Sequence, residues 1–479
     1  MSAPHFMAFL PELVLLAGPL VLFVLCVVPT RLALARGVAL ATAVGATGAT
    51  LLVFGSTATL FDGAYQVDRF SQTLKLVFTA GFALQLLLQG RLPDIRESVK
   101  PEYFLFLTLS VSGLTMLVSC VELIALLVAL QLSAFPVYLL VAMRNESEHH
   151  RQQMESAIKY IMFGVAANGI MLFGMSYLFG LTGTTSWPTM IARLQPVLGT
   201  PLAVTGLALM FCGLFYKLAI FPFHFWTPDV YQGASNETTG YIASLPKLGA
   251  LAILARFTAL APGGHPALTS LLTGLAVASM IYGNLLALTQ NDLKRLFGFS
   301  AIAHAGYAVI GFVAFDRAGL TAALYYMTGY LLMVMAGFVV IGRVSKDGAN
   351  VPIEDLAGLH RRSPLLAVTL VVGVFALAGI PPFAGFTGKL ALLTAAFAKG
   401  HLTLVIIAVI NTAIAVYYYL RIVREALFRD AGDHPAIALD VGTRILCVVL
   451  IAGIILLGVA PARVFEAISG SLGFMPAGN

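Results

Sequence analysis

The sequence predicts an all-α polytopic membrane protein with about fourteen transmembrane helices. Of its 479 residues, 59% are hydrophobic and only 10% are charged, whereas a typical soluble domain carries about 25% charged residues. Apolar runs long enough to cross a bilayer recur along the whole chain, and they are continuous rather than alternating. Because a backbone in lipid must satisfy its own hydrogen bonds, continuous runs favour helices over a closed barrel.

The predicted helices follow one another with mostly short connections, which indicates a single membrane domain. The first apolar run has no basic segment before it and no cleavage signal after it, so it is interpreted as a retained helix. The helices are predicted to begin near Phe9, Leu34, Ser71, Glu102, Val121, Gln153, Pro201, Asn236, Pro266, Lys294, Ala318, Pro364, His401 and Thr443. The predicted parts are three N-terminal helices (1–100), two five-helix repeats (101–261 and 262–430) and a C-terminal helix (431–479), together spanning 1–479.

The lysines and arginines between the helices are divided unevenly. One set of alternate connections carries most of them, including Arg31, Arg91 and Arg144, whereas the other set carries few, such as Arg193 and Lys399. The basic set should face the cytoplasm. With an even number of helices, both termini should then face the outer (periplasmic) side of a bacterial cytoplasmic (inner) membrane.

The four cysteines stand singly and the nine histidines are dispersed. This pattern argues against an iron–sulfur cluster, a zinc site or a disulfide framework. With no basic run outside the membrane connections, we expect no nucleic-acid partner.

Five lysines fall inside the predicted helices: Lys75, Lys159, Lys217, Lys247 and Lys389. Lys75 is close enough to a helix start to snorkel, and Lys159, roughly 9 Å into its helix, either snorkels or has a function. Lys217 lies roughly 24 Å and Lys247 roughly 16 Å into their helices. Each central lysine costs about 2.5–3.5 kcal/mol on insertion. A structural ion pair is the alternative, but acids at that depth are scarce, so we favour a proton relay.

Two of the predicted helices are interrupted by proline beside a lysine. Pro222 follows Lys217 in the seventh helix, and Pro381 and Pro382 precede Lys389 in the twelfth. A carbonyl freed in a membrane is tolerated only beside protein or water, so each break predicts a hydrated pocket, with a simple packed kink as the alternative. The seventh and twelfth helices are five apart and therefore run in opposite directions. Paired broken helices of opposite direction are typical of inverted-repeat transporters.

Three further titratable residues are candidates. His304 lies roughly 15 Å into the tenth helix and could join the two lysine sites; a histidine satisfied by a neighbouring hydroxyl is the alternative. Asp229 and Glu237 bracket the turn after the seventh helix. They are either turn and N-cap residues or a proton-collecting mouth.

These motifs carry a family resemblance. The run Phe-Pro-Phe-His-Phe-Trp-Thr-Pro-Asp-Val-Tyr after Lys217 resembles the signature of the subunit N family of respiratory NADH–quinone oxidoreductase (complex I). This antiporter-like family is related to the membrane subunits of cation/proton antiporters. The resemblance covers most of the chain, including 155–160, 291–307 and 379–389.

The resemblance implies a proton channel of two half-channels joined by a central chain of polar residues. Lys217, Lys247 and Lys389 would match the family's lysines of helices seven, eight and twelve, and Lys159 and His304 further positions on the polar axis. No cofactor is implied on this chain, since NADH, FMN, iron–sulfur clusters and quinone would belong to partner subunits. The implied partners are other membrane subunits, the lipid bilayer and protons.

One position departs from the family pattern. The frame Gln131-Leu132-Ser133 with Tyr138 places glutamine where the family usually has a helix-five glutamate, and glutamine cannot carry the charge. Glu122, nine residues earlier, is about half a turn out of phase and is a poor substitute.

Three other functions remain open. They are a cation/proton antiporter subunit, the same module in a proton-pumping hydrogenase-type complex, and a structural spacer between pumping subunits. Sodium transport would need intramembrane carboxylates or an array of carbonyls, and the deep segments offer few acids.

Overall fold

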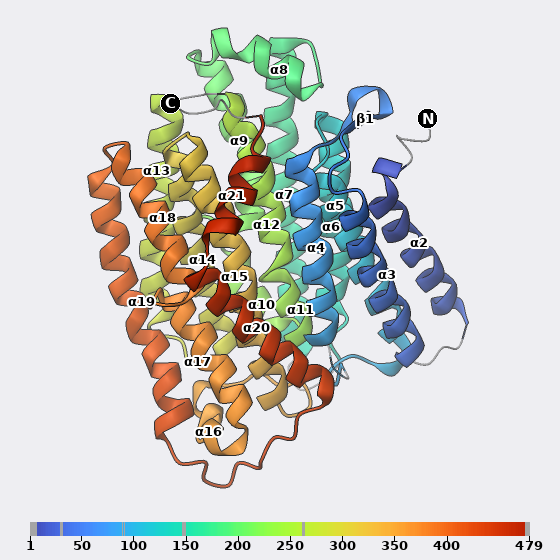
Figure 1. The fold of residues 1–479 in the computed structure, drawn as a ribbon, viewed down its shortest axis with the longest axis vertical. Helices are drawn as coiled ribbons and strands as arrows, with labels where there is room; N and C mark the ends of the chain where they lie inside the picture. The colour runs from blue at the N-terminus through green and yellow to red at the C-terminus, as the bar shows by residue number, and fades with distance from the viewer. Residues whose placement is uncertain are drawn as a thin grey trace.

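Long helices stand side by side along the long axis of the protein in the computed structural model (Figure 1). The structure describes residues 7–28, 32–88, 90, 92–145, 150–260 and 264–474.

The N-terminal part forms one edge of the bundle, at the right in Figure 1. It consists of α2 (Leu10–Val27), α3 (Leu32–Leu52) and α4 (Arg69–Leu88). Between α3 and α4 lies a small antiparallel hairpin of β1 (Ala58–Leu60) and β2 (Tyr65–Val67).

The middle of the chain contains both long and short helices. They are α5 (Lys100–Leu117), α6 (Leu123–Ala142), α7 (His150–Thr182), α8 (Trp187–Leu194), α9 (Pro201–Leu218), α10 (Trp226–Gly233), α11 (Asn236–Ile242) and α12 (Leu245–Phe257). The helix α11 is separated from α12 by a joint at Ser244, whose φ of −114° and ψ of −95° are not helical.

The last part of the chain continues the bundle. Its helices are α13 (Pro266–Ala287), α14 (Leu293–Val313), α15 (Arg317–Val344), α16 (Leu359–Arg362), α17 (Pro364–Ala378), α18 (Ala384–Ala398), α19 (Leu402–Phe428), α20 (Val441–Val459) and α21 (Ala462–Ser471).

Twelve helices in the described part of the chain are long and apolar enough to cross a membrane, and α17 and α18 are shorter apolar helices. This confirms the predicted all-α, multi-pass membrane fold. Each predicted span begins within a few residues of a helix, with α5 and the α17–α18 pair completing the set. The total of fourteen crossings and the two inverted repeats stay predictions.

Burial is greatest in the middle of the bundle. The helices α11 and α12 are buried along their whole length, α14 is buried except at Arg295, and α15 is nearly all buried. The outer helices α2, α3, α19 and α20 instead expose large apolar side chains, as lipid-facing helices do. Polar residues on the central helices are therefore held away from lipid.

Many of the arginines of the predicted basic side meet at one end of the bundle. Arg144, after α6, donates to the side chain of Asn350 at 3.1 Å. The backbone of Asp292, before α14, forms an isolated β-bridge with the backbone of Pro352. We call this the basic end; α16 lies there, at the bottom of Figure 1, whereas α8 lies at the opposite end. Arg31 and Arg91 lie outside the described residues.

Candidate functional site

The first break lies between α9 and α10. The helix α9 ends at Leu218 because Ala219 takes a left-handed conformation, with φ of +64°. Ending the helix leaves carbonyl groups without helical partners. The Nζ atom of Lys247, from α12, donates to the carbonyl of Leu218 at 3.2 Å. A buried lysine thus binds the carbonyl that the break frees.

The second break lies between α17 and α18 and has the same chemistry. The helix α17 ends at Ala378, followed by Gly379 with φ of +85°. The Nζ atom of Lys389 donates to the carbonyls of Leu377 and Ala378 at 3.1 and 3.2 Å. An ammonium group at a helix C-terminus is favourable because the helix dipole is negative there.

The backbones of the two breaks also agree in detail. At the first, the amide of Ile220 donates to the carbonyl of Phe215 at 2.9 Å; at the second, the amide of Ile380 donates to that of Phe375 at 3.0 Å. Each break then continues through a cis peptide bond before proline to phenylalanine, in the runs Ala219-Ile220-Phe221-Pro222-Phe223 and Gly379-Ile380-Pro381-Pro382-Phe383.

Lys217 is the last lysine before the first break and points toward α6. Its Nζ atom donates to the hydroxyl of Ser133 at 2.9 Å. The side-chain oxygen of Gln131 accepts from Asn168 at 3.1 Å instead. No ion pair to Lys217 occurs among the residues that the structure describes.

Glu122 does not replace the missing acid. It stands at the N-terminus of α6, where its carboxylate accepts from the amide of Ala125 at 2.7 Å. It is an N-cap, and it lies more than two turns of helix away from Ser133.

His304 lies on α14 between the two break lysines. Its ring nitrogens share hydrogen bonds with the hydroxyls of Tyr326 at 2.5 Å and Tyr419 at 3.0 Å. It is therefore satisfied by neighbouring hydroxyls, as the alternative interpretation expects. It is also within electrostatic reach of both Lys247 and Lys389.

An aromatic ring connects the histidine to the second break. The Nζ atom of Lys389 lies 4.7 Å from the ring centre of Tyr307, a distance typical of a cation–π contact. The same ring lies 6.3 Å from the ring of His304. The structure thus brings Lys247, His304 and Lys389 into one polar centre.

Lys159 lies at the surface of the basic end, with 36% of its side chain exposed. Its Nζ atom pairs with Asp229 and Glu155, at 2.6 Å each, and Arg295 pairs with Asp229 at 2.7 Å. A polar cavity of about 180 Å³ opens beside these groups, with Gln152 on its wall. Lys159 and Asp229 therefore belong to a polar surface cluster at the basic end and not to the buried centre.

Glu237 does not belong to this surface cluster. It is buried on α11, with 3% of its surface exposed, and its Oε2 atom has no hydrogen-bond partner among the described residues. The N-cap of α11 is Ser235, whose hydroxyl accepts from the amide of Thr238 at 3.1 Å. The N-cap interpretation of Glu237 is therefore wrong.

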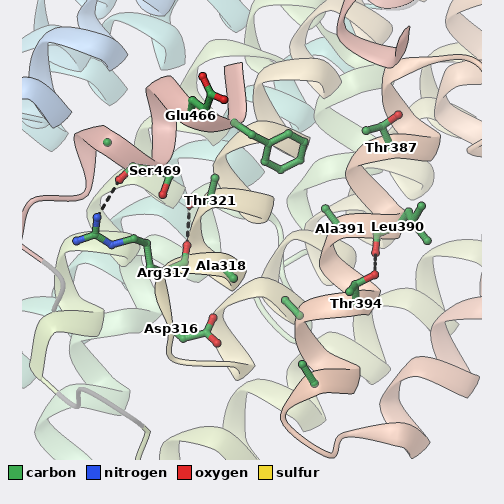
Figure 2. A pocket seen from close by; sticks show the side chains of 14 residues that line it. Asp316, Arg317, Ala318, Thr321, Thr387, Leu390, Ala391, Thr394, Glu466 and Ser469 are labelled. Atoms are coloured by element: carbon green, nitrogen blue, oxygen red, sulfur yellow. Dashed lines mark hydrogen bonds between the residues drawn. The ribbon is translucent and has the colours of Figure 1, made fainter. Parts of the chain in front are cut away.

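A larger cavity, of about 840 Å³, opens beside the second break. Figure 2 shows Asp316, the N-cap residue of α15, and Thr321 of α15 on one side, Thr387 and Thr394 of α18 on another, and Glu466 of α21 above. Its wall includes Leu390, the neighbour of Lys389 on α18. The cavity thus reaches the helix that carries Lys389, although Lys389 itself is not among the residues that line it.

Two basic residues close to predicted helix starts are buried. Lys75 does not snorkel: its Nζ atom pairs with Glu12 of α2 at 2.6 Å, both side chains are fully buried, and Tyr65 donates to Glu12 at 2.7 Å. That prediction was wrong because the partner is remote in sequence; the acid inside the first apolar run was the available signal. Lys294, at the predicted start of the tenth helix, is also buried, and it donates to the carbonyl of Ala234 at 2.7 Å.

No group of three or more histidine, cysteine, aspartate or glutamate residues in the described ranges could hold a metal ion. Two broken helices with buried lysines inside an all-helical membrane bundle define the class of antiporter-like membrane subunits.

Comparisons with known proteins identify the family. The family described as "NADH:quinone oxidoreductase/Mrp antiporter, TM" matches residues 120–415. A protein of Opitutus terrae called NADH-quinone oxidoreductase subunit N 2 is 61% identical over 468 residues, which cover 98% of each chain. One with the same name from Solidesulfovibrio magneticus is 43% identical, over 97% of this chain and 98% of that one. The chain belongs to the subunit N family of NADH-quinone oxidoreductases.

Solved structures have the same fold. A chain of respiratory complex I from Thermus thermophilus with bound aureothin matches with a TM-score of 0.82 and 29% identity, over 96% of this chain and 99% of that one. A chain of the Mrp complex from Dietzia sp. matches with a TM-score of 0.85 over 98% of this chain and 97% of that one, at 19% identity, which shows the fold alone.

Proposed function

We propose that this chain is the proton-translocating membrane subunit of an NADH-quinone oxidoreductase, with Lys217, Lys247 and Lys389 as the residues that carry protons. One observation carries the proposal: buried lysines bind the carbonyls freed at both helix breaks, and His304 lies within reach of both. Burial penalises the charged form of an amine, which is why a buried lysine can serve as a proton carrier.

The proposed route starts at the basic end. Protons enter beside Lys159 and Asp229, where the polar cavity opens, and reach Lys217 near the first break. They pass to Lys247 and along His304 to Lys389. Release then occurs through the cavity beside α18. Redox chemistry on partner subunits would drive the transfer by shifting charge along this line.

The matched backbone of the two breaks supports the inverted-repeat arrangement. Pro222 and Pro382 each precede a phenylalanine and follow a left-handed residue by three positions. We therefore propose that 101–261 and 262–430 form the two repeats, with 1–100 before them and 431–479 after them.

The distribution of arginine supports a bacterial cytoplasmic (inner) membrane location with the basic end inside and both termini outside. Other membrane subunits of the complex are the expected partners. NADH, FMN, iron–sulfur clusters and quinone would be bound by those and further subunits.

Replacing Lys217 with alanine in the assembled complex tests the proposal. Proton pumping driven by NADH oxidation should fall sharply, because the entrance is then cut off from the polar centre. The exposed Lys346, outside the helices, provides the matched control Lys346→Ala. Full pumping by the Lys217→Ala complex would refute the assigned role. Sodium-dependent transport without a quinone reductase partner would instead favour the antiporter alternative.

A further inference from the structure

We propose that Glu237 on α11 is the acid that exchanges protons with Lys217, and that it does so through hydroxyl groups of α5, α6 and α11. This inference rests on the proposed function and adds a proton-carrying residue to it. Two independent observations support it. One carboxylate oxygen of Glu237 is buried without a hydrogen-bond partner among the described residues. Hydrogen bonds also lead from Tyr241 of α11 through Ser110 to Ser133, the residue that Lys217 contacts.

Lys217 needs such an acid. Its ammonium contacts the hydroxyl of Ser133, and the nearby Gln131 is neutral and bound to Asn168. A hydroxyl can pass a proton on but cannot hold it near neutral pH. A proton released by Lys217 must therefore travel along hydroxyl groups to a group that can keep it.

Glu237 is placed to be that group. All seven residues of α11 are buried, and the helix is in contact with α4, α6, α10 and α15. The amide of Gln85 donates to the backbone carbonyl of Glu237 at 2.9 Å, not to its carboxylate. A buried polar atom without a partner is costly, so this one is satisfied by a proton of its own or by water.

The charged groups that face Glu237 are bound elsewhere. Asp94, Arg343 and Lys294 are within electrostatic reach of it. Lys294 donates to a backbone carbonyl of the α10–α11 connection, and Arg343 donates to the hydroxyl of Thr443. Asp94 pairs with Arg144 at 3.2 Å, although burial still raises the pKa of the Asp94 carboxyl. Within the described ranges, Glu237 itself has no ion pair.

The chain of hydroxyls begins at Tyr103 of α5. Its hydroxyl is within electrostatic reach of Glu237 and of Tyr241, and it accepts a long hydrogen bond of 3.4 Å from Thr238. Tyr241, one helical turn after Glu237 on α11, donates to the hydroxyl of Ser110 at 2.6 Å.

The chain ends at Ser133 of α6. The hydroxyl of Ser110 donates to the carbonyl of Ser133 at 2.7 Å, and the hydroxyl of Ser133 accepts from Lys217 at 2.9 Å. The contacts from α11 and from Lys217 thus reach the same residue through different groups, the backbone carbonyl and the hydroxyl of Ser133. The Ser133 hydroxyl itself donates to the carbonyl of Leu130 at 2.7 Å. Water completes the path where two hydroxyls do not touch.

The transfer is balanced. The Lys217 ammonium gives up one proton and becomes a neutral amine. Because the Ser110 hydroxyl donates to the backbone carbonyl of Ser133 and not to its hydroxyl, a water bridges these two hydroxyls in the proposed path. Each hydroxyl and this water accept one proton and pass one on, and the Glu237 carboxylate becomes a neutral acid. The reverse transfer recharges both groups, and no further reactant is required.

The test compares Glu237→Gln with Glu354→Gln, which makes the same change at an exposed acid. Both complexes are reconstituted in vesicles and assayed for proton pumping per NADH oxidised. We expect pumping to be lost in Glu237→Gln, partly restored in Glu237→Asp, and unchanged in Glu354→Gln. A carbonyl-stretch band of a protonated acid should also disappear from the infrared difference spectrum of Glu237→Gln alone. Normal pumping by Glu237→Gln overturns the inference.

A second pair of variants keeps the inference testable if Glu237→Gln fails to assemble. Ser110→Ala removes the link between α11 and Ser133, whereas Ser112→Ala removes a buried hydroxyl of the same helix that binds only backbone carbonyls of Leu15 and Thr108. Pumping should fall only in Ser110→Ala; equal pumping in both overturns the inference. If the Lys217→Ala complex does not pump and the Glu237→Gln complex pumps normally, the proposed function holds without a role for Glu237. Normal pumping by the Lys217→Ala complex refutes both the proposed function of Lys217 and the role of Glu237.

Discussion

Replacing Lys247 with methionine distinguishes a working lysine from one that only caps a helix break. The change removes a buried ammonium, which relieves about 2.5–3.5 kcal/mol of insertion cost. It also leaves the Leu218 carbonyl without its donor, which costs about 1–3 kcal/mol. The two effects nearly cancel, so the stability of the Lys247→Met complex should change by no more than about 2.5 kcal/mol. Proton pumping should nevertheless be abolished.

Lys247→Arg makes this test sharper. Arginine can still donate to the carbonyl of Leu218, but it does not lose its proton in proteins. We expect the Lys247→Arg complex to assemble, to unfold at about the same temperature, and to fail to pump. The assay measures proton uptake with a pH-sensitive dye in vesicles, together with NADH oxidation and thermal unfolding, and Lys346→Arg is the control. Pumping by Lys247→Arg at the level of the unchanged complex would refute a titrating role for Lys247.

Two predictions concern packing and burial. A Cβ atom on Gly113 would lie 2.4 Å from the backbone nitrogen of Ser133, so Gly113→Ala should force α5 and α6 apart and destabilise the protein by about 1–3 kcal/mol. A Cβ atom on Gly48 would have nothing within 4 Å, so Gly48→Ala should not destabilise the protein. Equal unfolding temperatures of the two variants would contradict the close approach of α5 and α6. Lys75→Met leaves Glu12 buried and unpaired and should cost about 3–5 kcal/mol, most of which a second change, Glu12→Leu, should recover. An unaltered unfolding midpoint in Lys75→Met alone would show that the pair does not stabilise the bundle.

The features that could be predicted from the sequence are those that depend only on residues close together in the chain. An apolar run and the polar residues at its ends determine where a helix lies, so the predicted spans begin close to the observed helices. Proline removes a helix donor wherever the chain folds. The interruptions at Pro222 and Pro382 could therefore be located without knowing any neighbour of α9 or α17.

The features it could not predict depend on contacts between distant segments. The partner of Lys75 is Glu12, in a different helix, and Lys217 meets a serine that lies 84 positions earlier. Glu237 follows a turn, which locally suggests a cap, but Ser235 takes that place and leaves the carboxylate inside the bundle. The periodicity and hydropathy of a sequence do not indicate which residues of distant segments will lie in contact.

The joint at Ser244 divides the eighth predicted helix into two rigid pieces, with Glu237 on α11 and Lys247 on α12. A helical hydrogen-bond ladder transmits a displacement along its length, and an interruption absorbs it. Substitutions that reshape α11 can therefore accumulate without moving the lysine that binds the first break.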